Sequence, residues 1–147
     1  MKTVVYKLMI CLGVFWGSIV IPLTAWSQSL AVIVNVGNKA EISQNDIKFI
    51  YKGQLKAFEN GFLALPLNQN NDSDIRKNFL NKVVKATKAQ YREYWIRKMF
   101  TGKGTPPRVV KGGDKVIKEY VSNNPSMIAY IAASSVDDSV RVVLRID

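Results

Sequence analysis

The sequence contains no histidine and a single cysteine, Cys11, among its 147 residues. Without histidine, the chain cannot supply a His-based catalytic triad, a His general base or a His metal ligand. One cysteine likewise excludes an internal disulfide bond and a zinc site built from several cysteines. Acidic residues are also few, with 11 Asp and Glu against 21 Lys and Arg, so the formal net charge is +10. The remaining composition, 48% hydrophobic and 22% charged, is typical of a globular protein, and the length suits one domain.

The first 27 residues have the pattern of a secretory signal peptide. Lys2 and Lys7 precede an uncharged apolar run from position 8 to 23, and a small residue, Ser27, ends a possible cleavage site. The alternative is a retained membrane anchor, but a spanning helix needs roughly 20 apolar residues. We therefore predict a signal peptide over 1–27, a domain over 28–147, a periplasmic location and no membrane span after cleavage. The cleaved chain lacks cysteine and carries 19 basic and 11 acidic residues, a net charge of +8.

Short apolar runs and helical repeats alternate along the rest of the chain. The apolar runs are rich in β-branched residues and predict strands over 30–36, 62–67, 127–131 and 140–146. In the last of these runs, apolar residues alternate with arginines, which predicts that one face of that strand meets solvent. The order of strands and helices predicts one α/β domain.

The helices are predicted from the residues that cap them. Ser43 and Thr87 are each followed three positions later by a residue that completes a capping box, Asp46 and Gln90 respectively. Acidic or hydroxyl side chains at such positions accept hydrogen bonds from the first N–H groups of a helix. The predicted helix caps are, in chain order, Ser43, Ser73, Thr87 and Asp114.

Residue groups that could carry catalysis are scarce. Asp72 and Asp74 flank Ser73 and have two interpretations, a weak oxygen site for a divalent ion or a polar helix start. The Gly-Lys-Gly-Thr segment at 102–105 lacks the spacing of a phosphate-binding loop and follows a helix instead of a strand. We therefore expect a protein that is not an enzyme and that holds no metal ion or cofactor.

A strongly basic stretch lies between positions 76 and 98, where eight basic residues and one acid, Glu93, give a local net charge of +7. Such a surface attracts phosphate polymers, anionic lipid head groups or acidic proteins. Nucleic acid is a poor partner for an exported protein, so the two interpretations that remain are a solvated face and docking to an acidic envelope protein. The candidate docking face consists of Lys82, Lys85, Lys88 and Arg92.

Three aromatic residues, Tyr91, Tyr94 and Trp95, lie within the same basic stretch. Aromatic side chains among basic residues can stack on nucleic-acid bases. Their spacing also fits the apolar side of a packed helix, and we predict that they belong to the core.

Several short motifs follow one another in a characteristic order. They are IS..DI..IYKG at 42–53, LPLNQ at 65–69, DSDIRKNF at 72–79, YW at 94–95, FTGKGTPP at 100–107 and NPSMIAYI at 124–131. In this order and spacing they resemble the motifs of the phosphate-type periplasmic substrate-binding proteins of ABC transporters. The resemblance implies a type II periplasmic-binding fold, a mixed α/β sheet flanked by helices, with this chain corresponding to a single lobe. It also implies a solute-binding role with phosphate or another oxyanion as ligand and an ABC permease as partner. The alternative is a non-transport interaction module that uses one lobe and its basic helices.

The resemblance also indicates where an anion would bind. The family's segment of approximate pattern Arg-x-x-Gly-Ser-Gly-Thr, aligned on Ser73, places Gln69 where the family has Arg, and aspartates in place of both glycines. A glutamine cannot form the charge-assisted pair of hydrogen bonds that arginine forms with phosphate. Nearby carboxylates oppose an anion. Ser73 supplies a hydroxyl at a helix start, and Arg76 adds positive charge one turn later.

We therefore predict weak oxyanion binding at this helix start. The alternative is that Ser73 only caps its helix. The candidate anion-binding residues are Gln69, Asn71, Ser73 and Arg76.

Overall fold

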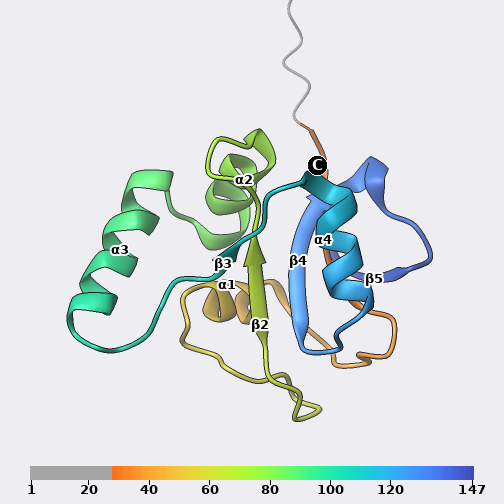
Figure 1. Cartoon of the computed structure of the whole chain (residues 1–147), viewed down its shortest axis with the longest axis horizontal. Helices are drawn as coiled ribbons and strands as arrows, with labels where there is room; N and C mark the ends of the chain where they lie inside the picture. The colour runs from red at the N-terminus through yellow and green to blue at the C-terminus, as the bar shows by residue number, and fades with distance from the viewer. Residues whose placement is uncertain (1–27) are drawn as a thin grey trace, which may run out of the picture.

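The computed structural model describes residues 28–147, and the predicted signal peptide lies outside this range. Five strands form one sheet in the order β3-β2-β4-β1-β5. Figure 1 shows β2 and β4 at its centre. The strands are β1 Leu30–Asn35, β2 Leu65–Asn68, β3 Arg108–Val109, β4 Met127–Ala132 and β5 Val140–Ile146. β1 runs antiparallel to β4 and β5, whereas β2 runs parallel to β3 and β4, so the sheet is mixed as predicted.

Helices cover both faces of the sheet. They are α1 Gln44–Tyr51, α2 Asp74–Phe79, its π-helical continuation Leu80–Val84, α3 Lys88–Phe100 and α4 Gly113–Ser122, with a 3-10 turn at Ala133–Ser135. Alternate residues of β1 and β4 point to opposite faces, so one core contains Val32 and Tyr130 and the other contains Ile33 and Ile131. α1, α2 and α3 close the first core, and α4 closes the second. In Figure 1, α3 lies to one side of the sheet, beyond α2.

The predicted capping boxes are confirmed. At the start of α1, the Ser43 hydroxyl accepts from the Asp46 N–H at 3.2 Å, and the Asp46 carboxylate accepts from the Ser43 N–H at 2.9 Å. Thr87 and Gln90 form the same reciprocal pair at the start of α3. These helix starts are encoded locally, within four consecutive residues.

Two of the sequence-based predictions about strands are wrong in detail. The strand predicted over 62–67 begins only at Leu65, because Phe62 and Leu63 lie exposed in a loop that pairs through a single bridge to Ala57. The last strand does not keep one wet face. A register shift beside β1 leaves Val143 without a paired residue, and β5 therefore contributes apolar side chains to both cores.

The predicted cap of α4 is also wrong. Gly112 precedes the helix at a φ of +111°, a conformation that favours glycine, and it offers no side-chain cap. Asp114 lies inside the first turn, where its carboxylate accepts hydrogen bonds from residues far away in the sequence. Within residues 28–147, no helix has the length and apolar character needed to cross a membrane.

Candidate functional site

A shallow hollow of about 520 Å³ lies where α2 and α4 begin. Its lining includes Gln69 and Ser73, two of the predicted anion-binding residues, together with Asp74, Gly113 and Asp114. The unpaired N–H groups at helix N-termini attract anions. Because two helices begin at this hollow, the backbone favours negative charge there.

The side chains that line the hollow disfavour an anion, in contrast to the backbone. Gln69 is only 3% exposed, and its Nε2 donates to Asp114 Oδ1 at 2.7 Å and to the Tyr130 carbonyl oxygen at 3.2 Å. The other carboxylate oxygen, Asp114 Oδ2, accepts from the Ala132 N–H at 3.1 Å. Two donors that could otherwise bind an oxyanion, Gln69 Nε2 and the Ala132 N–H, are thus already bonded to the Asp114 carboxylate. With Asp74 also in the lining, the hollow carries two acids and no basic residue.

Ser73 lies at the start of α2 in the way the sequence predicts. Its Oγ accepts from the Arg76 N–H at 3.4 Å, and its backbone is extended as expected of a capping residue. Its side chain is half-buried, so the hydroxyl remains within reach of a small anion in the hollow.

Arg76 points away from this hollow. Its Nη1 donates to the Gln69 carbonyl oxygen at 2.9 Å and to Asn71 Oδ1 at 2.6 Å. Arg76 and Asn71 line a second cleft, between α2 and α3. The four predicted anion-binding residues are therefore joined in one loop and helix start, but they are divided between two hollows.

The four residues of the candidate docking face also have different surroundings. Lys82 Nζ donates to the backbone oxygen of the last residue, Asp147, at 2.6 Å. Lys85 is exposed in the left-handed conformation that ends the π-helix. Lys88 and Arg92, on α3, line the second cleft. The basic stretch is thus distributed over several surroundings instead of forming one flat face.

Buried aromatic residues hold the loop of Gln69 in place. The Tyr130 hydroxyl accepts from the Gln69 backbone N–H and donates to Asn68 Oδ1, both at 3.1 Å. The Tyr130 ring stacks on Phe79 with 3.9 Å between centroids. Burial raises the pKa of Tyr130 well above the usual value, so its hydroxyl keeps its proton and both hydrogen bonds. The sequence does not indicate this role of Tyr130, because its partners lie about sixty positions away.

Two of the three aromatic residues of α3 belong to the core as predicted, whereas Tyr94 is half-buried and packs against it. Tyr91 and Trp95 are 3% and 4% exposed and belong to the first core. The Tyr91 hydroxyl donates to the Tyr51 carbonyl oxygen at 2.7 Å, and burial raises its pKa to about 12. Among residues 28–147, no group of three or more Asp, Glu, Cys or His side chains is placed to hold a metal ion.

The mixed sheet and its flanking helices correspond to one lobe of a periplasmic-binding-protein fold. The solved structures that share it include the following three. They are an ABC-type phosphate transport receptor from Vibrio cholerae (20% identity, TM-score 0.60), a protein described as a phosphate ABC transporter substrate-binding protein with bound phosphate from Clostridium perfringens (24%, 0.61), and PstS from Borrelia burgdorferi (19%, 0.57).

Each similarity covers 78% of this chain but only 44–46% of the other protein. At these identities the likeness shows the fold, and it confirms the predicted resemblance at that level. No protein-family model matches the chain, and no curated protein matches it.

Proposed function

We propose that the protein is a periplasmic solute-binding module, related to the substrate-binding components of phosphate ABC transporters, that binds phosphate or another oxyanion weakly. The observation that carries this proposal is the fold, which it shares with three phosphate-transport proteins. The partner that we propose for such a module is an ABC permease. The matched segment spans less than half of each of those proteins, so the proposal concerns the part of a solute-binding protein that corresponds to this lobe.

The hollow at the starts of α2 and α4 is the proposed oxyanion site. The Ser73 hydroxyl and the first N–H groups of both helices supply donors for an anion. The carboxylates of Asp74 and Asp114 supply repulsion, which is about 1 kcal/mol for unit charges 4 Å apart in water and several times larger in a drier cleft. Attraction from backbone dipoles is of similar size, so the two nearly cancel and binding is weak.

Calorimetric titration of the exported protein with phosphate tests this function. We expect saturable heat with a dissociation constant in the millimolar range, lost in Ser73→Ala. Ser43→Ala is the matched control, because it also removes an N-cap serine but at α1, outside the lining of the hollow. The absence of heat at millimolar phosphate, in a folded and monodisperse sample, would refute the proposal.

The second candidate function is a protein-interaction module that docks an acidic envelope protein. The exposure of Lys85, Lys88 and Arg92 favours it. If these side chains carry docking, replacing all three with glutamate abolishes recovery of acidic partners from envelope extract. Unchanged recovery would exclude electrostatic docking through this surface.

A further inference from the structure

The cleft between α2 and α3 has a volume of about 640 Å³. Sites for small molecules commonly have volumes of roughly 300–1,000 Å³ and combine mostly apolar walls with a few placed polar groups. The segment that returns from the end of α3 toward β3 (Figure 1) contributes Pro106 and Pro107 to the lining. The cleft is therefore bounded by three separate parts of the chain, and its two ends differ in character.

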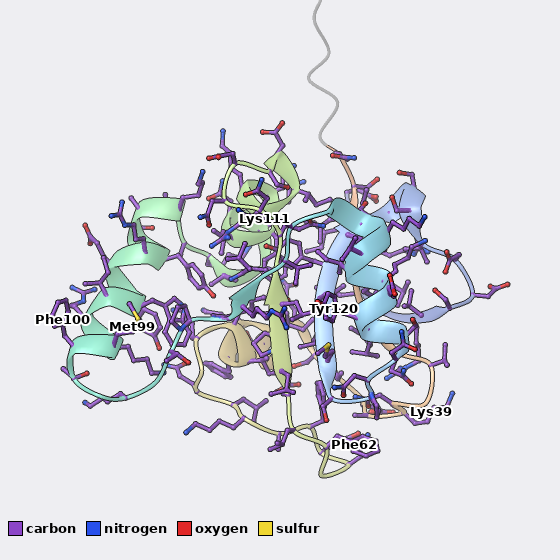
Figure 2. The ribbon with its side chains drawn as sticks, in the orientation of Figure 1. Lys39, Phe62, Met99, Phe100, Lys111 and Tyr120 are labelled. Atoms are coloured by element: carbon purple, nitrogen blue, oxygen red, sulfur yellow. The ribbon has the colours of Figure 1, made fainter. Side chains whose placement is uncertain are left out.

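One end of the cleft is apolar. Trp95, Ile96 and Met99 of α3 line it together with the two prolines and Val109. Met99 is 45% exposed and Val109 37%, so part of this wall is in contact with water. Figure 2 shows Met99 at the end of α3 that adjoins the returning segment. An apolar ligand part placed here would remove this surface from water, which is favourable.

The other end is cationic. Arg76 is fixed by the two hydrogen bonds of its Nη1, and its Nε is buried without a partner within residues 28–147. Neither bond uses Nη2, so this nitrogen remains available as a donor. Lys88 and Arg92 stand one helical turn apart on α3 and line the same cleft.

No acidic residue lines the cleft. The nearest acid to Lys88 is Asp72, at 3.7 Å, and the Asp72 side chain is 92% exposed. An exposed ion pair of this kind contributes little, so Lys88 can turn to a ligand at small cost. Arg92 has no hydrogen bond or ion pair within the part of the chain that the structure describes. A fixed guanidinium with two further cations in the same cleft matches a carboxylate.

We propose that this cleft binds an amphipathic carboxylate, a fatty-acid-like molecule whose head group meets Arg76, Lys88 and Arg92 and whose chain lies along Trp95 and Met99. Free phosphate satisfies the cations but leaves the apolar wall in water. A neutral hydrocarbon covers the wall but leaves the cations without a counter-charge. The proposal is independent of oxyanion binding at Ser73, because Ser73 lines the other hollow.

Fluorescence of Trp95 provides the assay. The other two tryptophans, Trp16 and Trp26, precede residue 28, and their replacement by phenylalanine leaves Trp95 as the only one whether or not residues 1–27 are retained. Dodecanoate, kept below its micelle concentration, should shift the Trp95 emission saturably with a micromolar midpoint. Dodecyltrimethylammonium, which has the same chain and the opposite charge, should bind at least tenfold more weakly. Inorganic phosphate at the same concentrations should cause no shift.

The charge requirement is tested by Arg92→Gln, which we expect to weaken dodecanoate binding at least fivefold. Arg97→Gln is the matched control, because Arg97 is an exposed arginine of the same helix that does not line the cleft. Circular dichroism verifies that both variants are folded. Any of three results would overturn the proposal. They are equal affinity for dodecanoate and the cationic detergent, equal effects of the two variants on dodecanoate binding, and no emission change with dodecanoate. None of these results alters the calorimetric test with phosphate.

Discussion

Replacing Asp114 with asparagine tests the account of weak anion binding most specifically. The carboxylate accepts from Gln69 Nε2 at 2.7 Å and from the Ala132 N–H at 3.1 Å, and it lines the proposed oxyanion site. Asparagine has nearly the same shape and keeps one acceptor oxygen, but it carries no charge. The substitution therefore removes a repelling charge with little change in the shape of the hollow.

The expected gain in affinity follows from Coulomb's law. Two like unit charges about 4 Å apart repel each other by about 1 kcal/mol in water and by about 4 kcal/mol at the lower effective dielectric constant near a protein surface. The hollow is open to solvent, so the lower part of this range applies. We expect Asp114→Asn to bind phosphate roughly five- to tenfold more tightly than the natural chain, since about 1.4 kcal/mol corresponds to a factor of ten.

The same substitution has a predictable cost in stability. One of the two donors now faces an amide N–H₂ group in place of an oxygen. Leaving a buried donor without an acceptor costs about 1–3 kcal/mol, so the free energy of unfolding should fall by an amount in that range. Tighter binding with lower stability in one variant is a combination that a general loosening of the fold would not produce.

Calorimetric titration with phosphate and urea unfolding measure the two effects. Asp138→Asn is the matched control, because it changes the net charge equally at an exposed position that does not line the hollow. If Asp114→Asn binds phosphate no more tightly than Asp138→Asn does, the carboxylate is not what limits binding and the reasoning is wrong.

Two further predictions concern stability. Tyr130→Phe removes the hydroxyl that accepts from the Gln69 N–H and donates to Asn68 Oδ1, and urea unfolding should show a loss of about 1–3 kcal/mol; a change below 0.5 kcal/mol would contradict this role. The Lys118 ammonium, which donates to Asp137, lowers the pKa of that carboxyl from 3.8 to about 2. This stabilisation is present above pH 4 and is lost as the pH falls toward 2, so Lys118→Gln should lower the thermal midpoint at pH 6 more than at pH 2, and an equal decrease at both would count against it.

The elements that the sequence predicts correctly are those encoded by neighbouring residues. The capping boxes at Ser43 and Thr87 lie within single helical turns, and the apolar runs of β1 and β4 are buried on both faces of the sheet. Short-range hydrogen bonding and burial of apolar runs are properties of local sequence. The register shift in β5 depends instead on how that strand meets β1, and the alternating pattern of its residues contains no sign of it.

In the candidate site, too, the sequence predicts the local features but not those that depend on the tertiary fold. Ser73 caps its helix as its position predicts. The sequence does not indicate that Asp114 accepts from Gln69, because these residues are 45 positions apart and meet only through the tertiary fold. Nor does the spacing of Ser73 and Arg76 indicate that their side chains line different hollows. The Arg76 side chain lines the second cleft because its Nη1 donates to the Gln69 carbonyl oxygen and to Asn71 Oδ1.

Nuclear magnetic resonance titration of ¹⁵N-labelled protein comprising residues 28–147 with phosphate tests the central claim most directly, because each backbone amide reports its own surroundings. We expect saturable shifts concentrated at the first-turn amides of α2 and α4, over residues 73–76 and 113–115, with a common millimolar dissociation constant. Shifts confined to residues 82–92, or no saturable shift at any amide, would contradict the claim.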